Sequence, residues 1–146
     1  MIKIIYEREM IQKKFKLWLP VFIWAGIIFF FSSRPTTAVS DIHWKDFIFK
    51  KTAHVVEYAI FTTLLFRALK ESSLSRLRAS YYSILIAIIY GLSDEFHQNF
   101  TPGREPKMRD LIFDTTGILL AIFIILKYLP KAPEKIRFWA KRLQLV

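Results

Sequence analysis

The residues best suited to chemistry fall into three groups, each at one end of an apolar stretch. The groups are His54, Glu57 and Tyr58, then the segment 94–98, and then Asp110 and Asp114. Imidazole and carboxylate side chains together suit either general acid–base catalysis or the binding of a divalent metal ion. Ionisable groups are costly in apolar surroundings unless they have partners. We therefore expect the three polar ends to meet in one site.

Helical spacing supports this expectation, because residues three or four positions apart share a helix face. Asp94, His97 and Gln98 are related in this way. Glu95 lies about 100° around the helix from its neighbour, so one of the two adjacent carboxylates is expected to point elsewhere. Gly117, three residues after the last aspartate, would allow close approach of another helix.

The candidate site residues divide by the chemistry that their side chains allow. We predict that acid–base catalysis involves His54, Glu57, Asp94 and His97. We predict that the substrate contacts are Tyr58, Glu95, Gln98 and Arg104. Arg104 suits a two-pronged contact with a phosphate or carboxylate. Asp110 and Asp114 are candidate ligands of a divalent metal, the only cofactor that these residues suggest.

The elements that must position these residues are four mostly apolar runs. They cover about 15–31, 53–69, 79–100 and 110–126, in a chain of 146 residues that is 53% hydrophobic, contains no cysteine and has a net charge of +10. Charges gathered between apolar runs are typical of membrane proteins. A bilayer crossing takes about 20 residues, so the shorter runs span it only if their polar ends lie inside. No run has a polar face, which argues against a soluble helical bundle.

The sequence therefore predicts an all-α protein, an integral membrane four-helix bundle. Residues 1–16 form a basic head, 17–126 the membrane domain, and 127–146 a basic tail that suits an interfacial helix. The head and first run also suit a signal peptide, but no clear small-residue cleavage site follows, which favours an uncut helix.

The basic residues predict the orientation. Fifteen of the 22 Lys and Arg residues lie in the head, the 67–78 connection and the tail, and seven lie in the other two loops. Both termini are thus expected in the cytoplasm, with all three polar groups at the extracytoplasmic face. These cations flank helices, so we interpret them as topology determinants and lipid contacts rather than a nucleic-acid surface. Arg67, at the cytoplasmic end, is expected to snorkel to the membrane surface.

A second motif is rejected. Ser33 and Arg34 followed by His43 and Asp46 invite comparison with membrane phosphatases, but the spacings differ from that motif. We expect His43 to lie in a loop between residues 32 and 51.

At the three polar groups the sequence resembles a known family. The resemblance rests on the segments 54–58, 67–69, 90–98 and 102–104, and on the spacing of Asp110, Asp114 and Gly117. These look like the VanZ-like family of bacterial membrane proteins, over about residues 17–126. Lys50 and Ala121 depart from the usual pattern. The resemblance implies a four-helix, multi-pass protein of the bacterial cytoplasmic membrane, in a family whose founding member is linked to teicoplanin resistance. It implies no settled activity.

Two functions stay open, and a structural interpretation stands beside them. An enzyme acting on an envelope lipid or lipid-linked precursor would use His54 or His97 as its acid–base group and Arg104 to hold an anionic headgroup. A non-catalytic protein would use the same residues to bind or mask such a ligand or a glycopeptide. A structural cluster would pair these residues with one another and lock the helices.

Overall fold

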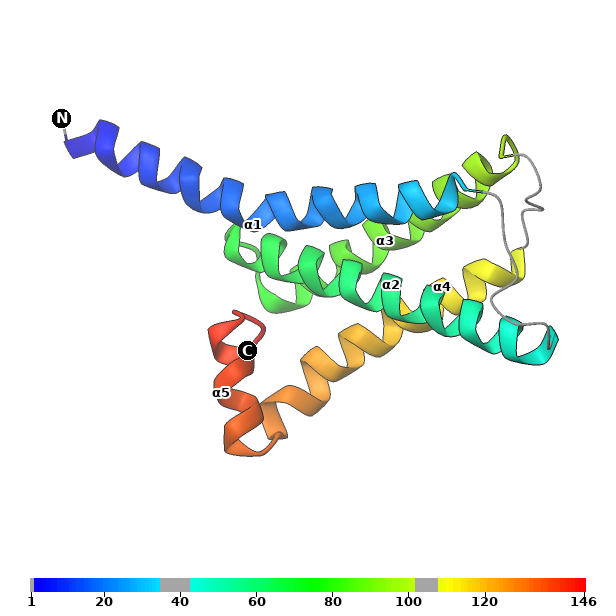
Figure 1. Ribbon diagram of the computed structural model, residues 1–146. Helices are drawn as coiled ribbons and strands as arrows, with labels where there is room; N and C mark the ends of the chain where they lie inside the picture. The colour runs from blue at the N-terminus through cyan, green and yellow to red at the C-terminus, as the bar shows by residue number, and fades with distance from the viewer. Residues whose placement is uncertain (1, 35–42, 102–107) are drawn as a thin grey trace.

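The computed structural model describes residues 2–34, 43–101 and 108–146, and these are helical apart from short turns and ends (Figure 1). The helices are α1 (Ile2–Ser32), α2 (His43–Glu71), α3 (Arg76–Gln98), α4 (Met108–Phe123) and α5 (Glu134–Arg142). A π-helical turn (Ile124–Tyr128) and a 3-10 turn (Leu129–Lys131) follow α4. No strand occurs in the described ranges, and the predicted all-α class is confirmed.

One predicted boundary is wrong. The helix α1 begins at Ile2 and so includes most of the basic residues that precede the first apolar run. The predicted loop 32–51 ends early, because α2 begins at His43, so that residue opens a helix instead of lying in a loop. Asp46 stands in the first turn, where a carboxylate is favoured, and forms an ion pair of 2.8 Å with Lys50 one turn later. Local pairing of charges thus extends the helix beyond its apolar part.

The first four helices alternate in direction, with α1 and α3 running one way and α2 and α4 the other (Figure 1). The helices α1 and α4 each pack on both α2 and α3. Two hydrogen bonds anchor α1: Trp24 Nε1 donates to the Glu57 carbonyl at 2.9 Å, and Tyr90 Oη donates to the Ala25 carbonyl at 2.7 Å. The ends of α1 and α3 and the starts of α2 and α4 gather at one end of the molecule (Figure 1).

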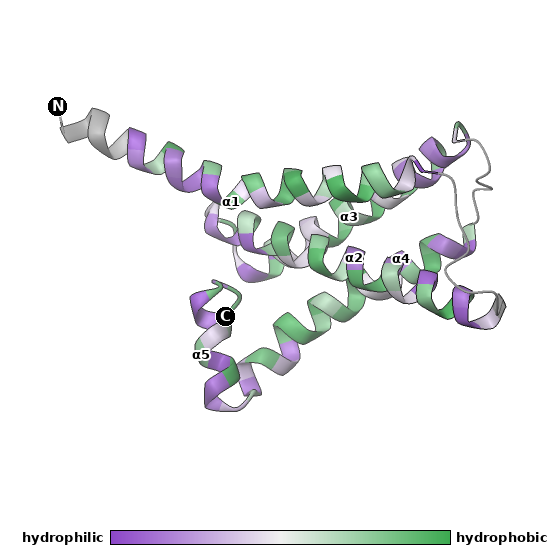
Figure 2. Ribbon diagram, viewed as in Figure 1, coloured by the Kyte–Doolittle hydropathy of each residue, from purple (hydrophilic) through white to green (hydrophobic). Residues whose placement is uncertain are grey.

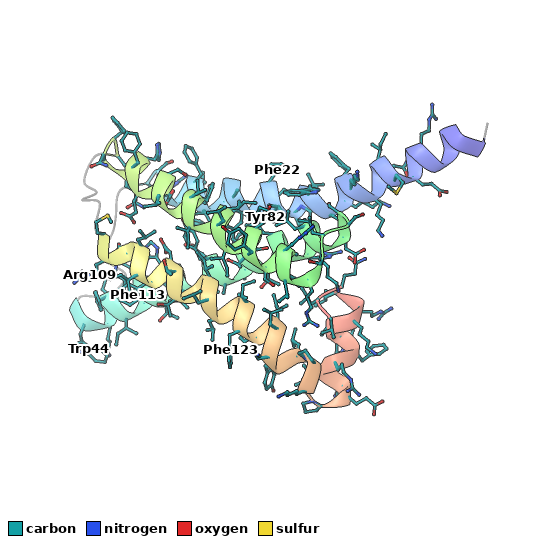
Figure 3. All side chains as sticks on the ribbon, turned by 180° about the vertical axis from the view of Figure 1, so that it is seen from behind. Phe22, Trp44, Tyr82, Arg109, Phe113 and Phe123 are labelled. Carbon is teal, nitrogen blue, oxygen red and sulfur yellow. The ribbon has the colours of Figure 1, made fainter. Side chains whose placement is uncertain are left out.

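Apolar side chains fill the core and also cover much of the outer surface. Large apolar side chains cover the outside, among them Phe22 (68% exposed) and Phe123 (60%), which point away from the helices in Figure 3. The buried residues include Asp94 (6% exposed) and Asp114 (1%). Figure 2 shows the hydrophobic residues along α1 and α4, with hydrophilic residues more frequent toward the helix ends. Extensive exposed apolar surface marks contact with lipid or another apolar partner.

Two helical stretches are long and apolar enough to cross a membrane. They are Arg8–Ser32 and Met108–Lys131, with mean hydropathies of 1.8 and 1.9. The helices α2 and α3 have 29 and 23 residues, but ionisable side chains interrupt their apolar runs. The apolar helices suggest a lipid bilayer environment.

Candidate functional site

The site is built on a close contact between α2 and α4, made at Gly117. A Cβ atom on this residue would lie 2.2 Å from the backbone oxygen of Val55, so no other residue fits without a shift. The prediction that Gly117 permits close helix approach is confirmed. The two helices run in the same direction, so the turns before this contact also face each other. This register brings His54 to Asp114, and Lys51 to Asp110.

His54 and Asp114 form the centre of the site. The histidine Nδ1 lies 2.9 Å from Asp114 Oδ1, and the side chains are 18% and 2% exposed. The other ring nitrogen, Nε2, lies 4.0 Å from Asp110 Oδ2, which is too long for a hydrogen bond. A buried carboxylate on one nitrogen fixes the orientation of an imidazole ring and leaves the other nitrogen for proton transfer.

Lys51 belongs to the site, although the sequence analysis counted it only as a loop charge. Its ammonium nitrogen lies 2.5 Å from Asp110 Oδ1, and both side chains are largely buried. It also lies over the rings of Phe47 and Phe113, 5.7 and 5.6 Å from their centroids. The rings of Phe47 and Phe113 themselves meet edge to face with centroids 6.2 Å apart, and Figure 3 labels Phe113 near the start of α4. The sequence does contain a signal that could have identified Lys51 as a site residue: it lies three residues before His54, on the same helix face.

Tyr58 connects this pair to α3. It is 1% exposed, and Gly91 makes room for its ring, since a Cβ there would lie 3.4 Å from Tyr58 Cε1. Its hydroxyl is buried and has no hydrogen-bond partner in the described part of the chain. It interacts electrostatically with Asp114, Asp94 and Glu57. Tyr58 therefore stands among carboxylates from three helices.

On α3, Asp94 faces the α2–α4 pair. Its Oδ2 accepts a hydrogen bond of 3.0 Å from Gln98 Nε2, and its charge interacts with that of Asp114. Glu95 is also buried, at 6% exposed. The predicted site residues that the structure brings to one end are His54, Glu57, Tyr58, Asp94, Glu95, Gln98, Asp110 and Asp114.

His97 is placed apart from the His54–Asp114 pair, at the contact between α1 and α3. Its Nε2 lies 3.1 Å from Ser33 Oγ, and its ring centroid lies 4.5 Å from that of Phe29. Spacing predicts that His97 and Asp94 share a face of α3, but it does not predict which neighbouring helix each one meets. Ser33 was missed as a partner. Arg104 lies outside the described residues.

The described side chains do not fit a divalent metal site. The described ranges contain no group of three or more His, Asp or Glu side chains arranged to hold a metal ion. Asp110 is paired with a lysine and Asp114 with a histidine nitrogen, so each carboxylate has a partner that competes with a metal.

Comparison with known proteins gives one result. A family model described as VanZ/LLP1 matches residues 17–129, which include α2, α3, α4 and the second half of α1. No curated protein and no solved structure shows a significant match. The match covers all of the polar residues just described and suggests a membrane protein linked to glycopeptide resistance. The chain belongs to the VanZ/LLP1 family.

Proposed function

We propose that this protein crosses the bacterial cytoplasmic membrane four times, with both termini in the cytoplasm and the polar site at the outer face. The alternating directions of α1 to α4 and the apolar exterior support four crossings. The excess of Lys and Arg at the opposite end supports the orientation. In this arrangement α5, with Phe138 and Trp139 exposed among basic residues, lies along the inner membrane surface.

The site acts on a cell-envelope lipid or lipid-linked precursor, and its action supports glycopeptide (teicoplanin) tolerance. The observation that carries this proposal is the 2.9 Å contact of His54 Nδ1 with the buried Asp114 carboxylate. It orients Nε2 as an acid–base group at the outer membrane face, where an envelope substrate is available. The ammonium of Lys51 supplies positive charge beside it, and Arg104 is proposed to hold an anionic headgroup.

A non-catalytic binding function is the alternative. The ion pair of Lys51 with Asp110 and the hydrogen bond of Gln98 with Asp94 favour it, because charges that are already paired suit a rigid receptor. Both functions place the ligand at the same residues. The two functions differ in whether the protein chemically modifies the bound ligand.

His54→Gln tests the proposal, because glutamine keeps a hydrogen-bonding side chain of similar size but cannot exchange a proton near neutral pH. Losing a general acid or base costs about 10²- to 10⁴-fold in rate. Compared at equal membrane levels, we expect the variant to lose any glycopeptide tolerance that the wild type confers. Mass spectrometry of extracted envelope lipids separates the alternatives: an enzyme changes a lipid-linked species in a His54-dependent way, and a receptor leaves the composition unchanged.

His97→Gln is the matched control, since it makes the same change on α3 at the contact with Ser33. It should retain most of the tolerance. Loss of tolerance in His97→Gln but not in His54→Gln would transfer the acid–base role to His97. Full tolerance in both variants would refute acid–base chemistry by a histidine at this site.

A further inference from the structure

A second polar feature lies at the other end of the molecule, away from the His54–Asp114 pair. It is a cleft of about 340 Å³ between the N-terminal half of α1, the end of α2 and the segment after α5. Its lining includes Glu9, Lys13, Lys16, Leu17, Arg67 and Gln144. Three basic side chains against one acidic side chain make this cleft suitable for an anion.

Arg67 is held in the cleft by the C-terminal segment. Its Nε donates a hydrogen bond of 3.0 Å to Gln144 Oε1. Lys70 Nζ donates to the backbone oxygens of Gln144 and Val146, both at 3.2 Å, which holds this segment against α2. These bonds leave the two terminal guanidinium nitrogens of Arg67 without a hydrogen-bond partner among the described residues. The hydrogen bond to Gln144 thus gives the Arg67 side chain a fixed orientation at the end of α2.

The two lysines of the cleft differ in whether they form an ion pair. Lys13 forms an ion pair of 3.1 Å with Glu71. Lys16, one turn further along α1, is exposed and has no ion-pair partner in the described ranges. Together with the terminal nitrogens of Arg67, it provides the charge available to a ligand.

Apolar groups lie beside these cations. Leu17 is a buried lining residue at 4% exposed, while Phe15 (64%) and Leu19 (41%) are exposed on the same part of α1. Exposed apolar and basic side chains on the same part of one helix are typical of the boundary between lipid headgroups and acyl chains.

We propose that this cleft binds the phosphate group of an anionic membrane lipid. Arg67 makes a two-pronged contact with the phosphate oxygens, because a guanidinium matches that geometry. Lys16 adds a second positive charge, and Gln144 acts as a positioning residue that orients Arg67. This lipid site is separate from the outer site and depends on the proposed function only through the orientation in the membrane.

The test uses the full-length protein in neutral detergent micelles, titrated with phosphatidylglycerol or with phosphatidylcholine while the melting temperature is followed. We expect apparent affinity for phosphatidylglycerol to exceed that for phosphatidylcholine. Arg67→Gln and Lys16→Gln should each weaken phosphatidylglycerol binding about five-fold, the effect of one cation at a lipid surface. Gln144→Ala should weaken phosphatidylglycerol binding in the wild-type background but not in the Arg67→Gln background. This difference distinguishes a positioning role of Gln144 from a direct contact with the lipid.

Lys14→Gln is the matched control, because it removes the same charge from α1 at an exposed residue that does not line the cleft. It should leave the affinity nearly unchanged. Equal losses in Lys14→Gln and Lys16→Gln would overturn the proposal and show only general attraction to charge. If inorganic phosphate at the same concentration raised the melting temperature equally, the cleft would be a site for free phosphate and the lipid proposal would be overturned. Lys16 is exposed, so its variant is informative even if Arg67→Gln fails to fold.

Discussion

Replacing Gly117 with alanine is expected to destabilise the protein by about 3 kcal/mol or more, at the upper end of the usual cost of overpacking. The added Cβ would lie 2.2 Å from the backbone oxygen of Val55. A backbone atom cannot rotate away as a side chain can, so α4 must move away from α2. That movement also separates His54 from Asp114, so we expect stability and glycopeptide tolerance to fall together. Thermal unfolding of the detergent-purified variant measures the first effect, and its helix content shows whether the helices still form.

Two other glycines provide controls for this substitution. Gly26→Ala introduces a Cβ with nothing within 4 Å, so it should be neutral or stabilising by up to about 1 kcal/mol through helix propensity. Gly91→Ala meets Leu111 Cδ1 at 3.3 Å and the Tyr58 ring at 3.4 Å, contacts that side chains can relieve, so its cost should lie between the other two. If Gly117→Ala unfolds at the same temperature as Gly26→Ala, the backbone contact between α2 and α4 is absent.

His54→Gln and Asp114→Asn should be strongly non-additive in stability. Removing one partner leaves the other buried without its hydrogen bond, which costs about 1 to 3 kcal/mol for a polar group and more for a charge. Once the first partner is gone, the second substitution adds little. A double-mutant cycle from unfolding free energies should give a coupling of about 1 to 3 kcal/mol.

The exposed pair Lys13 and Glu71 is the control cycle. Its nitrogen and oxygen lie 3.1 Å apart, but the lysine side chain is 58% exposed, so solvent screens the interaction. Lys13→Gln with Glu71→Gln should therefore show a coupling of about 0.2 to 1 kcal/mol. Additivity in the His54–Asp114 cycle would mean that these side chains do not meet.

Much of the site was predictable because it depends on helix periodicity and alternating direction. The spacing of Asp110, Asp114 and Gly117 indicates one face of α4, and the polar ends of α2, α3 and α4 must gather if consecutive helices reverse direction. The same periodicity, together with the apolar composition, was sufficient to predict that the protein is all-α.

The remaining features depend on which helices become neighbours, and periodicity carries no information about that. His97 meets Ser33, directly after α1, instead of Asp114, although its spacing predicts a shared face of α3 with Asp94. Lys51 was assigned to a loop because hydropathy places the start of α2 at its apolar part. The structure extends α2 back to His43, so Lys51 becomes a site residue paired with Asp110.

An envelope function requires the His54–Asp114 end of the protein to face outward. The chain has no cysteine, so single cysteines report accessibility without ambiguity. Lys45→Cys and Asn99→Cys lie at exposed positions near this end, and Ser73→Cys lies at an exposed position between α2 and α3 at the other end. Intact cells treated with a membrane-impermeant maleimide should label the first two variants, and Ser73→Cys should be labelled only after the cells are permeabilised. Labelling of Ser73→Cys alone in intact cells would place the site in the cytoplasm and contradict a function at the outer membrane face.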